Sequence, residues 1–79
     1  MEYNIELQGR DLITFRNAHS LSRRQLAEKV GLSYSYIAAI EKDEVRISEE
    51  TENRIRDILG ITDHRLERYR SLSEALRNV

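Results

Sequence analysis

Residues able to perform chemistry are few in this chain of 79 residues, and they are scattered. It contains no cysteine, and its two histidines, His19 and His64, lie far apart in turn or capping contexts. The three glycines form no glycine-rich phosphate loop, and the carboxylates are interleaved with lysine and arginine, as on solvated helix faces. No set of ligands typical of a metal site is present. The sequence therefore predicts a protein that is not an enzyme and that uses no metal and no cofactor.

Phosphate binding is the one chemistry that a local group of residues supports. Arg23 and Arg24 follow Ser22 at the start of a predicted helix. Backbone N–H groups at such a helix start, together with the two guanidinium groups, would form an anion site. The helix dipole disfavours cations at this end, so the two arginines indicate a bound anion rather than a stabilising role within the helix.

One stretch of the chain reads as two short helices, at 23–30 and 34–42, joined by a tight turn. Ser22 and Ser33 precede the two helices, and each serine can serve as an N-cap. Gly31 can adopt the left-handed conformation that ends the first helix. Two helices set at a sharp angle by a short glycine-containing turn predict a helix-turn-helix, whose second helix enters the major groove of DNA.

The composition indicates one all-α soluble domain. Charged residues make up 34% of the chain, and proline is absent. No apolar run approaches the ~18–20 residues needed to span a bilayer, and no signal peptide is visible, so we expect a cytoplasmic protein. The net charge is −1, whereas domains that bind nucleic acid usually carry a basic excess. Residues 41–61 hold seven acids and four bases, whereas residues 1–40 hold four acids and five bases, so one face can still be positive.

Further elements flank the predicted pair of helices. Residues 1–7 alternate between apolar and polar side chains, which is a strand signature. They form either a loose arm or an early turn of the next helix, or else a short strand that pairs with its copy in a dimer. The other predicted helices lie at 8–18, between a Ser48 N-cap and Gly60, and at 64–78 after an Asp63 N-cap.

The last two predicted helices carry apolar residues at helical spacing. The helix after Ser48 is expected to direct Ile55, Ile58 and Leu59 inward, and its acidic first turn to be solvated. The final helix carries one apolar stripe, made of Leu66, Tyr69, Leu72, Leu76 and Val79. This stripe either covers the small core or forms a dimer interface, and its five positions exceed what a terminal cap needs, which favours dimerisation.

Several short motifs share their spacing with one known family. They are Gly9 to Arg16, Leu21-Ser22 with Leu26-Ala27, Gly31-Leu32-Ser33, Ile37 with Ile40-Glu41, and Leu59-Gly60-Ile61. Together they resemble the helix-turn-helix domains of the Cro and lambda-repressor type, also called the xenobiotic-response-element family. The resemblance implies a compact five-helix, all-α, lambda-repressor-like fold with the helix-turn-helix at helices two and three. The chain would then divide into an arm at 1–8, a DNA-binding domain at 9–61 and a C-terminal dimerisation helix at 62–79.

The resemblance also implies a role for each matching position. Arg16 and Glu41 would form an ion pair that ties the first helix to the end of the recognition helix. The positions implied to reach base edges are Tyr34, Ser35, Ala38 and Ala39. They lack the long amides and guanidinium groups of bidentate base contacts, so we expect more reliance on phosphate contacts and DNA shape. The positions expected to contact phosphate are Ser22, Arg23, Arg24, Tyr36, Lys42 and Arg46, with packing against the second helix as the alternative for Tyr36.

The function implied by the resemblance is that of a transcription regulator bound to double-stranded DNA. It would be a repressor or autoregulator, encoded by a bacterium or a phage, that binds a palindromic operator as a homodimer. The chain departs from the family pattern after Glu41, where Lys42 and Arg46 are the only cations of the loop and Glu49 and Glu52 replace apolar residues. This acidic stretch supports an alternative, a protein-interaction module of the anti-repressor or antitoxin type. A protein anti-repressor would be a further partner of the regulator.

Overall fold

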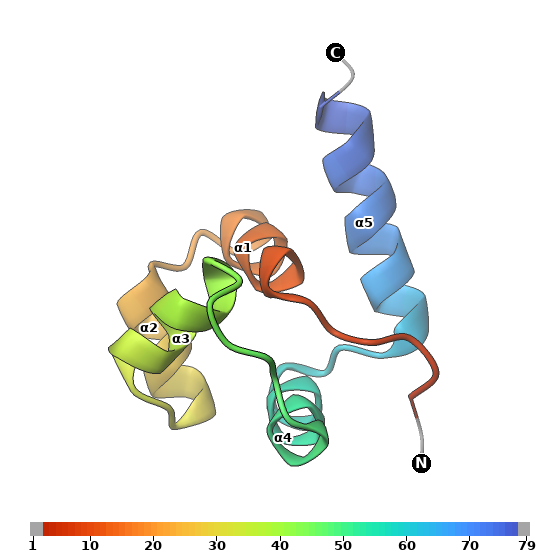
Figure 1. Cartoon of the computed structure of the whole chain (residues 1–79). Helices are drawn as coiled ribbons and strands as arrows, with labels where there is room; N and C mark the ends of the chain where they lie inside the picture. The colour runs from red at the N-terminus through yellow and green to blue at the C-terminus, as the bar shows by residue number, and fades with distance from the viewer. Residues whose placement is uncertain (1–2, 78–79) are drawn as a thin grey trace.

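The computed structural model describes residues 3–77 of the chain, and five helices lie within this range (Figure 1). They are α1 (Gly9–Ala18), α2 (Arg23–Val30), α3 (Tyr34–Glu41), α4 (Glu49–Leu59) and α5 (Asp63–Arg77). No β-strand occurs within these described residues. The all-α architecture and the short helices α2 and α3 confirm the prediction, with boundaries that differ from it by about one residue because helix ends fray.

Helix α1 lies between the two halves of the molecule. It packs against α3 on one side and against α5 on the other, while α2 packs against both α3 and α4 (Figure 1). At the approach of α1 to α3, a Cβ atom on Gly9 would collide with the carbonyl group of Ile40. Gly9 is therefore required for this close packing, a role that the sequence did not suggest.

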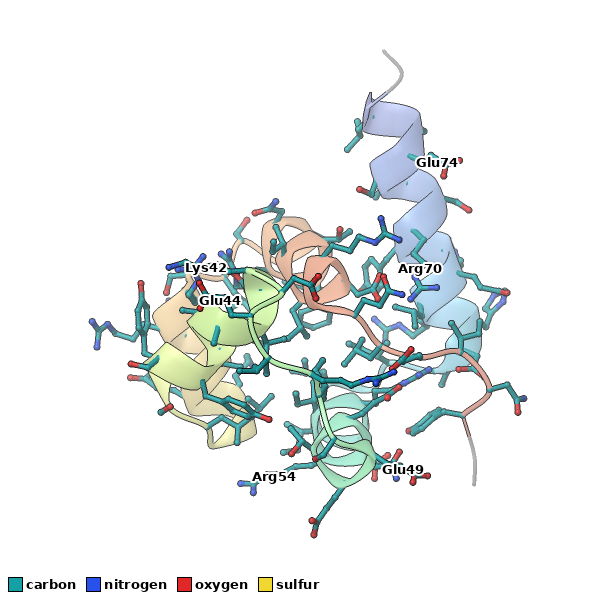
Figure 2. All side chains as sticks on the ribbon, viewed as in Figure 1. Lys42, Glu44, Glu49, Arg54, Arg70 and Glu74 are labelled. Atoms are coloured by element: carbon teal, nitrogen blue, oxygen red, sulfur yellow. The ribbon has the colours of Figure 1, made fainter. Side chains whose placement is uncertain are left out.

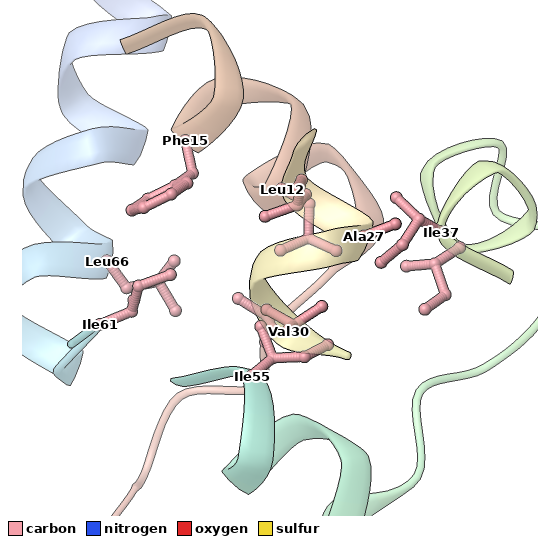
Figure 3. Close-up of a cluster of buried hydrophobic side chains, with 11 residues drawn as sticks. Leu12, Phe15, Ala27, Val30, Ile37, Ile55, Ile61 and Leu66 are labelled. Atoms are coloured by element: carbon pink, nitrogen blue, oxygen red, sulfur yellow. The ribbon is translucent and has the colours of Figure 1, made fainter. Parts of the chain in front are cut away.

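The hydrophobic core draws side chains from the arm and from all five helices (Figure 3). Its buried members are Leu7, Leu12, Phe15, Leu26, Ala27, Val30, Ile37, Ile40, Ile55, Ile61 and Leu66. Figure 3 shows the small Ala27 side chain directed toward Ile37, where α2 meets α3. The small residue lets the two helices of the motif approach closely.

Helix α4 departs from the predicted pattern of burial. Ile58 was expected to face the core, but it is 50% exposed. The reason is that α4 contacts the core with the side that carries Ile55, Arg56 and Glu52, all of which are buried. The expectation that the acidic first turn is solvated is therefore wrong for Glu52.

Helix α5 uses only part of its apolar stripe for the fold. Leu66 is 1% exposed within the core, and the ring of Tyr69 packs edge-on against Phe15 with centroids 5.8 Å apart. Leu66 is therefore occupied within the core of the single chain, whereas Tyr69 is only half-buried. Leu72 and Leu76 are 51% and 69% exposed, and Val79 lies outside the described residues.

The N-terminal arm, residues 3–8, has no regular secondary structure, bends at Ile5 and passes the start of α5 (Figure 1). Leu7 is buried while Glu6 is exposed, so the period-two pattern reports an extended segment with one face inward. Its backbone groups bind charged side chains instead of a strand. Asn4 N donates to Asp63 at 2.7 Å, and Leu7 N donates to Glu52 at 2.8 Å.

The side chain of Arg56 is the centre of this docking. It is fully buried, and it binds Asp63 at 2.6 Å and Glu52 at 3.1 Å. It also donates to the carbonyl groups of Ile5 at 2.6 Å and Ile61 at 2.9 Å. One guanidinium group thus joins the arm, α4 and the start of α5, because its planar fork of donors reaches all three segments.

The start of α5 corrects a further prediction. Thr62, not Asp63, caps the helix, since Thr62 Oγ1 accepts from Arg65 N at 3.1 Å. Asp63 lies in the first helical turn and turns its carboxylate to the arm and to Arg56. A hydrogen bond from Asn4 N–H, and then one from Arg56, lower the pKa of Asp63, and together they outweigh the opposite effect of burial.

Candidate nucleic-acid interface

The two helices of the motif are set by their caps. Ser22 Oγ accepts from Gln25 N at 3.0 Å, and Ser33 Oγ accepts from Tyr36 N at 3.1 Å. Gly31 ends α2 in the left-handed conformation, with φ of 70°. A side chain is strained at that φ, so glycine fixes where the chain turns into α3. The predicted caps and turn are thereby confirmed.

A buried carboxylate, that of Glu41, holds three helices together. Arg16 from α1 forms a bidentate pair with it, through Nε at 2.7 Å and Nη2 at 3.0 Å. Arg23 from α2 adds a third bond through Nε, at 3.0 Å. The Glu41 side chain is fully buried, whereas those of Arg16 and Arg23 are 16% and 27% exposed. The structure thus contains the expected pair of Arg16 and Glu41, with Arg23 as an additional partner.

Arg23 is partly committed to this structural role. The hydrogen bond to Glu41, and then one to Tyr34, raise the pKa of Arg23 above its ordinary value, so its positive charge is permanent. Two arginines share the single carboxylate, which leaves the group formed by Arg16, Arg23 and Glu41 with a net charge of +1.

The aromatic ring of Tyr34 organises the cations at the start of α2. The guanidinium carbons of Arg24 and Arg23 lie 5.4 Å and 5.9 Å from its centroid, within cation–π range. Tyr34 is 45% exposed at the first position of α3. Within residues 3–77 no carboxylate lies at ion-pair distance from Arg24. The ring therefore holds Arg24 beside α3 while its charge stays unneutralised.

The outer face of α3 is small and weakly polar. Ser35 is exposed, whereas Ala38 and Ala39 are half-buried, so only their methyl groups are available on this face. Tyr36 packs half-buried against the core. Of the two alternatives for Tyr36, this half-buried position favours packing.

The two cations of the loop after α3 differ in their surroundings. Lys42 is exposed directly at the C-terminal end of α3, beside Glu44 in Figure 2. Arg46 is also exposed, and its Nε lies 4.0 Å from a carboxylate oxygen of Glu6 in the arm. An exposed pair at this distance is weak, so Arg46 keeps most of its freedom to bind elsewhere.

Several of the residues that position this surface were missed from the sequence. Asp11 and Arg70 join α1 to α5 through two bonds of 2.8 Å and 2.9 Å, and the bond to Asp11 raises the pKa of Arg70. The sequence contained one signal for them. Asp11 directly precedes the apolar residue Leu12, and Arg56 directly follows the apolar residue Ile55, on the core side of their helices. A charge at such a position is expected to be buried and paired.

Other kinds of site find little support in the described residues. Within residues 3–77, no three side chains of the metal-ligating types come together in a way that could hold an ion. No helix in that part of the chain combines the length and apolar character needed to cross a membrane.

The comparison with protein families defines the class of this molecule. The model of the helix-turn-helix family matches residues 12–66, which covers α1 to α4 and the start of α5. The chain belongs to this helix-turn-helix family, of the Cro and xenobiotic-response-element type. The family is one of DNA-binding transcription regulators, and the five helices have its lambda-repressor-like fold.

Comparison with individual proteins adds no nearer relative. Neither the curated proteins nor the solved structures contain a significant match to this chain. What the chain does within its family therefore has to be argued from its own residues.

Proposed function

We propose that this protein is a sequence-specific repressor or autoregulator that binds a palindromic operator as a homodimer, with α3 in the major groove. The observation that carries the proposal is the position of Arg24. It is stacked on the exposed ring of Tyr34, without a carboxylate partner among the described residues, at the point where the start of α2 adjoins α3. A cation held in this way is ready to bind a phosphate.

Recognition of the DNA sequence should rely largely on the shape and deformability of the DNA. Ser35 can form one hydrogen bond with a base, and the methyl groups of Ala38 and Ala39 can contact thymine methyls. Each interaction discriminates less than a bidentate pair. Phosphate contacts at Ser22, Arg23, Arg24, Lys42 and Arg46 would fix the register, and the deformability of the DNA would supply the remaining specificity.

The dimer would form through the outer part of α5. Leu72 and Leu76 are exposed there. A second copy would cover the two leucines and place the two α3 helices about one turn of DNA apart, roughly 34–36 Å.

The first test selects DNA from a library of duplexes with a randomised 20-bp segment at about 100 mM salt, and then follows the enriched duplex by fluorescence anisotropy. We expect a palindrome, with an affinity that falls steeply as salt rises. An absence of enrichment, with only weak and salt-sensitive binding, would reject the regulator. It would favour the alternative, a protein-interaction module that uses the acidic loop after Glu41.

The second test addresses the dimer through Leu72→Glu, with Ser71→Glu as the matched control. Both substitutions place one new carboxylate on an exposed position of α5, but only the first lies on the apolar stripe. We expect Leu72→Glu alone to shift the protein to a monomer in sedimentation velocity and to weaken operator binding. A wild-type protein that sediments as a monomer on the operator would reject the homodimer.

A further inference from the structure

Arg54 is an unneutralised cation beside the turn of the helix-turn-helix. It is exposed on α4, and within residues 3–77 no carboxylate lies at ion-pair distance from its guanidinium group. Its Nη2 atom lies 2.6 Å from the place that a Cβ atom on Gly31 would occupy. The glycine that ends α2 therefore also leaves room for the guanidinium group against the backbone of the turn.

The charges of α4 are separated between its two sides. Figure 2 shows Arg54 extending toward the α2–α3 pair, whereas Glu49 extends to the opposite side of the helix. The carboxylate of Glu52 is engaged by Arg56 and by Leu7 N. Glu49 and Glu52 are therefore directed away from the motif, whereas the exposed Glu50 lies one helical turn from Arg54 without forming an ion pair with it.

The guanidinium groups of Arg24 and Arg54 lie near opposite ends of α2. Arg24 lies in the first turn of that helix, while Arg54 reaches the glycine that follows its last residue. The helix between these points spans about 10 Å, so the two guanidinium groups would meet different phosphates of one duplex. Phosphate binding is largely a matter of placing unpaired cations along the DNA backbone, and each contact adds to the salt dependence.

We propose that Arg54 contacts a DNA phosphate and so extends the interface from the start of α2, across the turn, onto α4. The inference rests on the proposed function, since it concerns the same DNA-binding surface. It assigns a binding role to a residue outside the two motif helices, from a helix whose sequence is acidic overall. The contact is sequence-independent, and it would add affinity without altering the operator.

The test compares Arg54→Gln with Arg68→Gln on the duplex enriched from the randomised library. Arg68 is also exposed and without a carboxylate partner among the described residues, but it lies on α5, across α1 from the motif (Figure 1). Anisotropy between 50 and 200 mM NaCl gives Kd and its salt slope. We expect Arg54→Gln to raise Kd about tenfold and to reduce the slope by about 0.9. Arg68→Gln should change neither, and Arg54→Lys should keep the slope.

The outcomes separate this inference from the function on which it rests. Thermal unfolding and sedimentation of each variant establish that fold and oligomeric state are intact. An unchanged slope for Arg54→Gln, with a reduced slope for Arg24→Gln, overturns the assignment of Arg54 alone. Equal losses for Arg54→Gln and Arg68→Gln also overturn it, because they indicate a long-range effect of net charge. A wild-type protein that binds no duplex overturns both proposals.

Discussion

Beside the pair of Asp11 and Arg70, two buried ionic groups hold this small domain together, and these two are opposite in charge. At the first, the Glu41 carboxylate accepts from two arginines of α1 and α2. At the second, the Arg56 guanidinium binds the carboxylates of Glu52 and Asp63. Each joins three segments of the chain, but the first leaves a net charge of +1 beside the motif and the second a net charge of −1 beneath the arm. The fold thus places its surplus cation where the DNA would lie and its surplus anion away from it.

The two groups also differ in access to water. Arg56 is fully buried, and it binds groups of the arm, of α4 and of the start of α5. The arginines at Glu41 are partly exposed, so they can exchange protein contacts for water or for a phosphate. The group at Arg56 therefore acts in stability alone, whereas the group at Glu41 couples stability to the proposed interface.

The largest effect is expected from Arg56→Met. This change leaves two carboxylates and two carbonyl groups of the arm and turn without their donor, which should cost about 3–5 kcal/mol of unfolding free energy. Urea unfolding followed by circular dichroism measures it. Arg54→Met on the exposed side of the same helix is the control and should stay within about 0.5 kcal/mol. A loss below about 1 kcal/mol for Arg56→Met would contradict a structural role.

Glu41→Gln should destabilise the protein less, by about 1–3 kcal/mol, because Arg16 and Arg23 can turn to water. The same change removes an anion next to the proposed interface. Binding of DNA at 50 mM salt should therefore tighten, with a steeper salt slope, in contrast to every arginine variant. Parallel unfolding and anisotropy measurements decide the matter. If Glu41→Gln costs as much stability as Arg56→Met, the two groups do not differ as argued.

Strong acid should weaken the group at Arg56. The pKa of Asp63 is lowered from its ordinary value of 3.8 by Asn4 N–H and Arg56, so its ionised form is stabilised in the folded state. Its contribution is fully present above the unfolded pKa of about 4 and is lost as the pH falls through the lower folded pKa. Urea unfolding between pH 2.5 and 7 should show this decline in the wild-type protein. Asp63→Asn should be less stable at pH 7, and its unfolding free energy should fall less steeply as the pH is lowered. An equally steep fall in the variant would contradict the role of Asp63.

The smallest effect separates two neighbouring arginines. Arg24→Gln should reduce the salt slope of DNA binding by about one without changing stability, because Arg24 has no carboxylate partner among the described residues. Arg23→Gln should reduce the slope less and should lower the unfolding midpoint, because its Nε is bound to Glu41. Anisotropy and thermal unfolding of the two variants test this difference. Identical behaviour would show that Glu41 does not restrain Arg23.

Local signals in the sequence specify the five helices and the helix-turn-helix motif. Serine caps at Ser22, Ser33 and Ser48 and the glycines that end α2 and α4 are local signals, since each acts within one helical turn. The spacing of these motifs resembles that of the helix-turn-helix family, and the resemblance implies the pair of Arg16 with Glu41. Such features are readable because they depend on separations along the chain.

The burial of each helix face and the partners of the charged side chains depend on long-range packing in the folded structure. Ile58 of α4 and Leu66 of α5 both lie at helical spacing from other apolar residues. Ile58 is exposed and Leu66 is in the core, because the packing of each helix covers only one of its sides. The docking of the arm on Arg56, and the approach of Arg54 to Gly31, join residues that are more than twenty positions apart. The partners of a buried charge depend on which segments meet around it, and local pattern does not carry that information.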